Sequence, residues 1–398
     1  MPKYNTLTKQ YCDYLEVLIQ THDYTFTKDD IEVFKQHNKI RLISKRDSSY
    51  YQDWSGSINN LPDNITHLEL PTKYNQNIEK FPKNLKVLIL NEYYNKELYL
   101  SEPLEELIFQ TVASEFNQNI IFPSTIKYIQ FGDRYDQPLN NLPHSLETLI
   151  LSNKTSTHPL DNLPSNLKTL KLLNAINNNI NLNYLPQCLT YLEITRHDNI
   201  ELTIGMDNLP STLQTIKFSG IIGLNNSIRN LPYNLENLYI DVYDNLDLSY
   251  LPDNLKNLYI TGSRYLEPIK ITKLPSKLEI LQLTNVIINN SSRNILQLDF
   301  LPLALKEFSI VNNYNRITSY NMSITLPDSI IKLKIHDSRD LANCLLELNK
   351  IPMSCEDLNI YITNNIETRL VIKEITKIPA KISMNTTYLK KIFEKFTF

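Results

Sequence analysis

The fold predicted by this 398-residue sequence is an α/β solenoid: a stack of about fourteen short parallel strands with irregular return segments and helical caps at both ends. Three observations lead to this prediction. One ten-residue pattern recurs along most of the chain, its copies are 19 to 27 residues apart, and each copy carries two apolar bands that it cannot bury alone.

The recurring pattern is Φ-P-x-x-Φ-x-x-Φ-x-Φ, where Φ is an apolar residue. Residues 231–240 (LPYNLENLYI) and 251–260 (LPDNLKNLYI) agree at eight of ten positions. The copy at 100–109 keeps the apolar positions but has Ser101 in place of the proline. In the other thirteen copies the proline is Pro62, Pro82, Pro123, Pro143, Pro164, Pro186, Pro210, Pro232, Pro252, Pro275, Pro302, Pro327 and Pro352.

Each copy is expected to contain a turn and a short strand. The end of the pattern has period two, as in Leu238-Tyr239-Ile240, which predicts a strand with both apolar side chains facing inward. The proline opens the preceding turn, where a missing N–H does no harm. The second residue after the proline is Asn, Ser or Thr in ten of thirteen copies, and we expect these side chains to bond neighbouring backbone groups. They are Asn64, Asn84, Thr125, Ser145, Asn166, Thr212, Asn234, Asn254, Ser329 and Ser354.

A second apolar band precedes the proline and reads Φ-x-x-Φ-P. Ile58 and Leu61 form it in one copy, and Leu248 and Leu251 form it in another. A single copy cannot bury both this band and the strand, whereas copies stacked in parallel bury both. We therefore expect a solenoid over residues 55–365.

Both ends of the chain lack the repeat and are expected to cap the solenoid. Residues 6–20 have apolar positions at helical spacing, and residues 28–37 form a second predicted helix with Thr27 as its N-cap. Together they make up an N-terminal helical region, 1–54. Residues 385–398 place Tyr388, Leu389, Ile392, Phe393 and Phe396 on one helical face, which predicts a capping helix within the C-terminal region, 366–398.

Composition and motifs exclude several classes of function. The net charge is −3, with 40 basic and 43 acidic residues, so no electrostatic footprint for nucleic acid or an anionic membrane is present. No apolar run reaches the ~18 residues of a membrane span, and no signal peptide is recognisable. We therefore expect a cytoplasmic protein with reduced cysteines. Six glycines and the absence of phosphate-loop, zinc or nucleophile motifs predict a protein without catalytic activity, cofactor or metal.

The outward strand positions are the predicted partner-binding site. In a curved solenoid the residues between the inward-facing positions line the concave surface, and tyrosine is common at protein interfaces. We expect this face to bind a protein. The candidate residues are His67, Glu69, Tyr128, Gln130, Tyr191, Glu193, Tyr239 and Tyr259.

The segment after the strand carries a resemblance to a known family. It reads YNQNI at 74–78, FNQNI at 116–120 and YDQPL at 135–139. Together with the Φ-P-x-x-Φ-x-x-Φ-x-Φ strand, this aromatic-Asn-x-x-Ile segment resembles the FNIP repeat, a relative of the leucine-rich repeat. The resemblance covers roughly residues 55–362 and implies a curved, leucine-rich-repeat-like solenoid. Similar proteins are abundant in social amoebae and in giant DNA viruses of amoebae, which implies the host cytoplasm if the protein is viral.

Residues 40–46 (IRLISKR) carry a second resemblance, to the late part of an F-box. That module docks on the Skp-type adaptor of a cullin-containing SCF ubiquitin ligase, so the resemblance implies a substrate-recruiting adaptor. The implied apolar contacts are Leu15, Leu18, Ile19, Ile40, Leu42 and Ile43. They can equally be core residues of a cap, in which case the protein is a repeat scaffold with no link to ubiquitin. The sequence leaves both interpretations open.

Overall fold

The computed structural model divides the chain into two compact units. The first consists of Met1–Asn177 with Tyr184–Arg196, and the second of Asn178–Asn183 with His197–Phe398. The structure describes residues 8–11, 14–19, 21–44, 54–110, 114–152, 158–173, 179–196, 203–221, 227–242, 246–262, 269, 271, 273–286, 295–312, 321–337, 345–362, 369–375 and 377–384.

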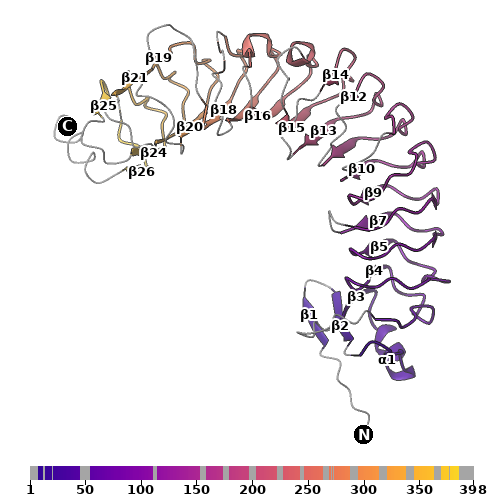
Figure 1. Ribbon diagram of the computed structural model, residues 1–398. Coiled ribbons are helices and arrows are strands. Elements are labelled where there is room, and N and C mark those ends of the chain that lie inside the picture. Colours follow the sequence, from indigo (N-terminus) through magenta and orange to yellow (C-terminus); the bar gives the residue numbers. More distant parts are fainter. Residues whose placement is uncertain are drawn as a thin grey trace. The chain divides into compact units, whose positions relative to one another are not determined.

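The first unit contains a parallel sheet in which each strand pairs with the next copy of the repeat (Figure 1). Its strands are β2 (Tyr14–Ile19), β3 (Lys39–Ser44), β4 (His67–Glu69), β5 (Val87–Leu90), β7 (Glu106–Phe109), β9 (Tyr128–Phe131), β10 (Thr148–Leu151), β11 (Thr169–Leu172) and β13 (Tyr191–Thr195). At its N-terminal edge, β1 (Thr8–Tyr11) pairs antiparallel with β2. On the return side, β6 (Leu98–Tyr99) pairs with β8 (Ile120–Ile121).

The second unit contains a parallel sheet of the same kind. Its strands are β15 (Thr215–Ile221), β16 (Asn237–Val242), β17 (Asn257–Gly262), β18 (Ile280–Thr284), β20 (Glu307–Asn312), β22 (Lys332–Asp337), β24 (Asp357–Ile362) and β26 (Lys381–Met384). Its return side also forms sheets, which were not expected. β12 (Asn179–Asn181) pairs with β14 (Thr203–Gly205), and β19 (Ile295–Leu298), β21 (Asn321–Ile324), β23 (Leu345–Leu348) and β25 (Arg369–Ile372) pair in sequence. The second unit also contains two short 3-10 helices, Ser227–Asn230 and Leu248–Tyr250.

The parallel register places equivalent residues of the repeat next to each other, so the predicted parallel-strand solenoid is confirmed. Leu238 pairs with Leu258, and Leu258 with Leu281, all at inward positions that are at most 1% exposed. Each of the fourteen copies of the pattern contains one strand of a main sheet. The buried aliphatic column that results is the core of each unit, and its burial is the main source of stability.

The turn that precedes each strand is closed in the same way throughout. In all fourteen copies the third residue after the proline position donates its backbone N–H to the carbonyl at that position, as Leu85 does to Pro82 over 3.1 Å. Seven of the ten predicted Asn, Ser and Thr side chains also donate to backbone carbonyls of the preceding segment. They are Asn64, Thr125, Ser145, Asn166, Asn234, Ser329 and Ser354.

One of the two predicted N-terminal helices is wrong. Residues 8–11 and 14–19 form β1 and β2, and burial in β2 follows period two, with Leu15, Val17 and Ile19 in the core. A short apolar run fits both the helical period and the strand period. Residues 14–19 form a strand because the free edge of β3 supplies backbone hydrogen-bond partners for it.

The other N-terminal helix is confirmed as α1 (Lys28–Phe34). The hydroxyl of Thr27 accepts from the backbone N–H of Asp30, and the carboxylate of Asp30 accepts from the N–H of Thr27, which makes a capping box. The helix predicted over 385–398 lies outside the described residues.

Candidate protein-binding face

All eight predicted partner-binding residues lie at outward strand positions, on the side of the main sheet that faces away from the core. We call this side the open face; it is the face that was predicted to be concave. β4 carries His67 and Glu69, β9 and β13 carry two residues each, and β16 and β17 carry one tyrosine each. Six of the eight residues belong to the first unit and two belong to the second.

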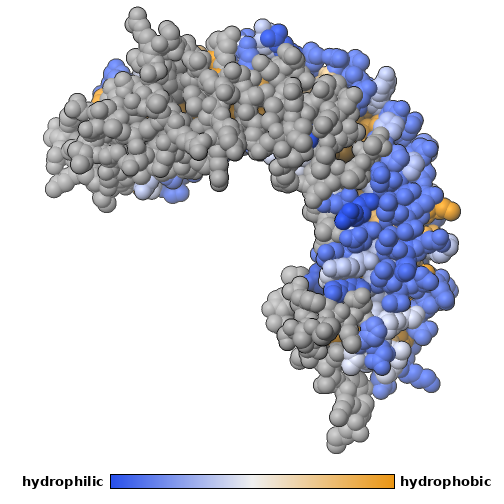
Figure 2. Space-filling model, viewed as in Figure 1, coloured by the Kyte–Doolittle hydropathy of each residue, from blue (hydrophilic) through white to orange (hydrophobic). Residues whose placement is uncertain are grey.

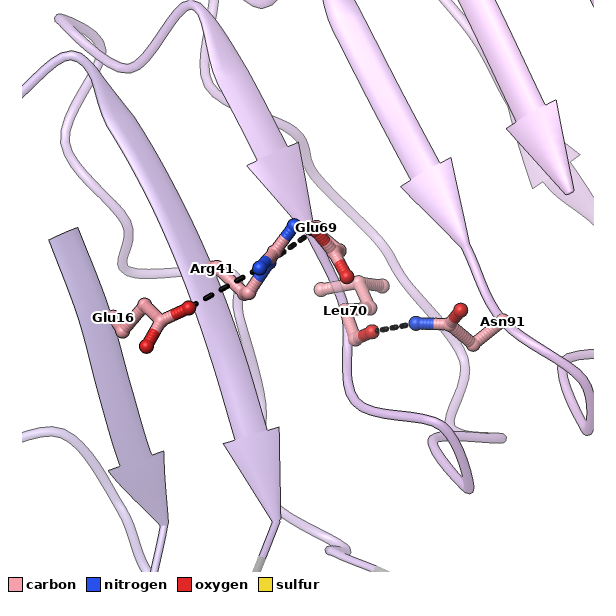
Figure 3. Close-up of polar contacts among 5 residues, drawn as sticks. All are labelled: Glu16, Arg41, Glu69, Leu70 and Asn91. Carbon is pink, nitrogen blue, oxygen red and sulfur yellow. Dashed lines mark hydrogen bonds and ion pairs between the residues drawn. The ribbon is translucent and has the colours of Figure 1, made fainter. Parts of the chain in front are cut away.

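At the N-terminal end of the first unit, an arginine joins two carboxylates across three strands (Figure 3). Arg41 Nε lies 2.5 Å from Glu69 Oε2, and another guanidinium nitrogen of Arg41 lies 3.1 Å from Glu16 Oε1. Burial lowers the pKa of Arg41, but its bonds to Glu69 and Glu16 outweigh burial and raise it overall. Glu69 was predicted as a site residue; Glu16 and Arg41 were missed because a helix was expected where β2 lies.

His67 lies beside this network, in surroundings that disfavour its protonated form. Its Nδ1 is 2.9 Å from the hydroxyl of Thr66, and its ring meets Tyr14 edge-on with the ring centroids 6.3 Å apart. Burial lowers the pKa of His67, and the nearby ammonium groups of Lys39 and Lys86 lower it further. His67 therefore offers a polar contact.

Tyr128 and Gln130 bond to each other on the open face. The Tyr128 hydroxyl donates to Gln130 Oε1 over 3.1 Å. The Gln130 amide in turn donates to the carbonyl of Phe109 on the neighbouring strand over 3.2 Å. The two side chains are thus held in place by hydrogen bonds within the sheet.

The same arrangement recurs on β13. The Tyr191 hydroxyl donates to Glu193 Oε2 over 2.9 Å. Lys171 on β11 lies 3.2 Å from that carboxylate and 5.2 Å from the centre of the Tyr191 ring. These contacts fix a second preorganised polar cluster.

Between the Glu69 network and the β13 cluster, the open face is partly aliphatic. Val87 and Ile89 on β5, Ile108 on β7 and Ile150 on β10 occupy outward positions in register with the polar residues. Their side chains were overlooked because the prediction emphasised tyrosine. Aligning the copies would have found them, since Val87 falls at the repeat position of His67 and the three isoleucines fall at that of Glu69 and Gln130.

In the second unit, amides and aromatic rings line the open face over β16 and β17. Tyr239 and Tyr259 stack with their ring centroids 4.5 Å apart and their planes at 4°. Beside them, the Asn257 amide donates to Asn237 Oδ1 over 2.6 Å, and the Asn237 amide donates to Thr215 Oγ1 over 3.1 Å. These side chains follow one another along the sheet because equivalent residues of successive copies stack in register.

The residues proposed as adaptor contacts do not share one surface. Leu15, Ile19, Ile40 and Leu42 are at most 5% exposed and lie in the core beneath β2 and β3. Leu18 and Ile43 are half-buried, pair in register and lie at outward positions. Four of the six side chains are therefore used for packing.

A charge ladder borders the strands and was not predicted. The fourth residue after the proline position is Lys, Glu, Lys, Glu and Lys in five successive copies of the first unit, and Glu, Lys, Glu and Lys in four copies of the second. Opposite charges consequently meet between rungs, as Glu105 does with Lys86 at 3.2 Å and with Lys127 at 3.1 Å. Each exposed pair contributes little to stability, but stacking like charges in register would be unfavourable. Other pairs are Glu147–Lys168, Glu236–Lys256 and Glu279–Lys306.

The described part of the chain lacks both a metal-binding cluster and a membrane-spanning helix. It has no group of three or more His, Cys, Asp or Glu side chains placed to hold a metal ion. None of its helices is long and apolar enough to cross a membrane.

Comparisons with known proteins agree with this architecture. The FNIP repeat family model matches residues 116–154 and 244–285. No curated protein matches the chain. The solved structure of CroV588, described as a novel circular LRR protein, matches at 22% identity with a TM-score of 0.57, over 87% of this chain and 59% of that one. The chain therefore spans less than two thirds of the length of CroV588.

A second solved structure, YopM from Yersinia enterocolitica WA-314, matches at 18% identity over 88% of this chain and 85% of that one, with a TM-score of 0.41. The stacked parallel strands and the open face define the class as a β-solenoid repeat protein. Within that class, residues 116–154 and 244–285 are similar to the FNIP repeat, and the chain shares its fold with CroV588.

Proposed function

We propose that the chain is a cytoplasmic, non-enzymatic scaffold that binds a protein partner on the open face of its main sheets. The observation that carries this proposal is the parallel register, which lines up outward side chains from successive copies. A solenoid of this kind presents a broad, fixed surface without needing loops to organise it. Leucine-rich-repeat-like folds in general bind proteins.

The composition of the open face of the first unit supports this role. Its aliphatic centre, with Ile89 and Ile108, lies between two polar clusters that contain Glu69 and Tyr191. Protein interfaces commonly combine an apolar centre with a polar rim. The polar residues are already bonded to one another, so binding would order few side chains.

A pair of photo-crosslinking variants tests the proposal. A photoreactive phenylalanine analogue replaces Ile108 on the open face or, as the matched control, Ile121, which is 85% exposed on the return side. Each variant is irradiated in lysate of a social amoeba, the source suggested by the FNIP resemblance. We expect one protein to be captured through position 108 and not through 121, and to bind the purified chain afterwards. Capture through 121 alone would contradict the proposal.

A second candidate function is recruitment of a ubiquitin ligase through residues 1–54. Leu18 and Ile43 favour it, because these aliphatic side chains lie side by side at outward positions and Ile43 belongs to the segment that resembles an F-box. The test is binding of a purified Skp-type adaptor to the full chain and to a Leu18→Asp/Ile43→Asp variant. Binding that the double substitution abolishes would support the adaptor function. Absence of binding to the folded wild-type chain would eliminate it.

A further inference from the structure

We propose that the open face of the first unit binds a protein segment that presents a lysine or arginine beside aliphatic side chains, with Glu106 as the anchor for the basic group. This inference rests on the proposed function and specifies the chemistry of the partner. It depends on the position of Glu106, on the charge balance of the face and on the side chains around it.

Glu106 lies at an outward position of β7, in register with Val87 on β5 and Tyr128 on β9. Its side chain is partly exposed. No hydrogen bond or ion pair of its carboxylate is formed within the described part of the chain. By contrast, Glu105, the preceding residue, meets two lysines at 3.1 and 3.2 Å.

The other carboxylates on this open face are already compensated. Glu16 and Glu69 both contact Arg41, and Glu193 contacts Lys171. From β2 to β13 the outward strand positions carry four carboxylates and three cations, which leaves an excess of one negative charge. The carboxylates are Glu16, Glu69, Glu106 and Glu193, and the cations are Lys39, Arg41 and Lys171.

The field of this carboxylate reaches its neighbours on the open face. Burial raises the pKa of the Tyr128 hydroxyl, and Glu106 raises it further. Burial also raises the pKa of Tyr14, followed by Glu69; Arg41 lowers it, and Glu106 adds a smaller increase. The carboxylate of Glu106 is therefore felt at Tyr128 on the neighbouring strand and, more weakly, at Tyr14.

The surroundings of Glu106 match the shape of a basic side chain. Val87, which pairs in register with Glu106, is only 7% exposed, and Ile108 lies two residues further along the same strand, so Glu106 has aliphatic neighbours on the open face. Lysine and arginine pack their methylene stems on such surfaces while the charged head reaches a carboxylate. Ile89 and Ile150 extend the apolar surface, so the aliphatic neighbours of the basic residue can pack there.

Selection from a random peptide library displayed on phage, against the immobilised full-length chain, tests this proposal. Enriched peptides are synthesised, and their affinities are measured for the wild type, Glu106→Gln and the matched control Glu105→Gln, whose thermal unfolding is compared first. We expect enrichment of Lys or Arg next to aliphatic residues. Glu106→Gln should weaken binding about tenfold or more, whereas Glu105→Gln should change it less than about twofold.

Charge reversal provides a second readout. A Glu106→Lys variant should lose the selected peptides, and a peptide with its basic residue changed to Glu should regain affinity for that variant. Peptides without a basic preference that depend on Ile108 but not on Glu106 would overturn this inference and leave the proposed function standing. Peptides that depend on no open-face residue, or failure to enrich any peptide, would contradict both.

Discussion

The two units build the same strand repeat on different return segments. In the first unit the copies are 19 to 22 residues apart, and the return segments stack aromatic rings inside the unit. In the second unit the copies from Pro275 to Pro352 are 25 to 27 residues apart, and the segments between them form β19, β21 and β23, whose sheet β25 extends. The strand and the turn therefore define the solenoid, while the length of the return segment decides how its far side is closed.

The aromatic ladder of the first unit contains five side chains in succession. The ring centroids of neighbouring members lie 5.1 to 6.4 Å apart, and every member is at most 2% exposed. The ladder consists of Trp54, Tyr74, Tyr94, Phe116 and Tyr135. Each unit therefore has its own interior, and hydrophilic residues predominate on the visible surface of the first (Figure 2).

A ladder of side-chain amides runs beside the rings of the first unit. Asn75 Oδ1 accepts from the backbone N–H of Asn95 over 3.0 Å, and Asn95 Oδ1 accepts from that of Asn117 over 3.0 Å. Asn117 Oδ1 continues the ladder to the N–H of Asp136 over 2.9 Å. These bonds satisfy amides that have no strand partner. In the second unit, the return-side sheet of β19, β21, β23 and β25 provides backbone partners for such amides instead.

The largest expected difference between the two units is in their stability at alkaline pH. Burial raises the pKa of Tyr74, Tyr94 and Tyr135 far above the value of a free tyrosine. These groups stay neutral in the folded state but ionise in the unfolded state near pH 10, so stability is fully present below pH 10 and is lost as pH rises. The loss should approach about 4 kcal/mol per pH unit for three tyrosines.

Fluorescence measures this loss in the first unit, because Trp54 is the only tryptophan and packs against Tyr74 with the ring centroids 5.1 Å apart. Urea unfolding is followed between pH 8 and 11 by Trp54 emission and by circular dichroism. We expect the urea concentration at the midpoint of unfolding, as reported by Trp54 emission, to decrease as the pH rises above 10. A midpoint independent of pH would contradict the burial of the tyrosines.

Removing one amide of the ladder should have the next largest effect. Asn95 Oδ1 accepts from the backbone of Asn117 and from the Gln118 amide over 2.9 Å, so Asn95→Ala leaves two donors unpaired. We expect a loss of about 2 kcal/mol in urea unfolding. The matched change in the second unit, Asn257→Ala, breaks only a bond between side chains and should cost less than about 1 kcal/mol. Equal losses of stability in the two variants would contradict the view that the Asn95 amide, unlike that of Asn257, is needed to satisfy backbone groups.

Deleting a buried hydroxyl should stabilise the first unit slightly. Among the described residues, no hydrogen-bond partner lies within reach of the Tyr94 hydroxyl, although Tyr94 is 1% exposed. Tyr94→Phe should therefore raise the free energy of unfolding by up to about 1 kcal/mol. Tyr128→Phe is the control and should lower the free energy of unfolding, because it breaks the bond to Gln130. A destabilised Tyr94→Phe variant would indicate a partner for this hydroxyl.

Of the features tested by substitution, the charge ladder should contribute least to the free energy of unfolding. Glu105→Gln removes one carboxylate that meets Lys86 and Lys127 on the exposed border of the strands. We expect a loss of less than about 0.5 kcal/mol, diminishing at 1 M NaCl, in thermal unfolding. A larger loss that is independent of salt would mean that Glu105 acts through packing instead of charge.

The sequence predicts the parts of the fold that depend on one copy. The strand, the turn and most of the Asn, Ser and Thr bonds follow from spacing within the repeat. What it misses depends on contacts between copies. Tyr94-Asn95 continues the aromatic and amide ladders without the full YNQNI motif, and Arg41 joins two carboxylates only because β2 and β3 are neighbours. The same holds for β2, whose apolar residues fit a helix until the edge of β3 pairs with them.

Oxidative footprinting of side chains tests the central claim, binding on the open face, most directly. Hydroxyl radicals are applied to the chain alone and to its complex with the partner captured through position 108. The account predicts protection of Ile89, Ile108 and Tyr128, with unchanged labelling of Tyr99 and Ile121 on the return side of the same unit. Protection of Tyr99 and Ile121, with Ile108 and Tyr128 still labelled, would contradict it.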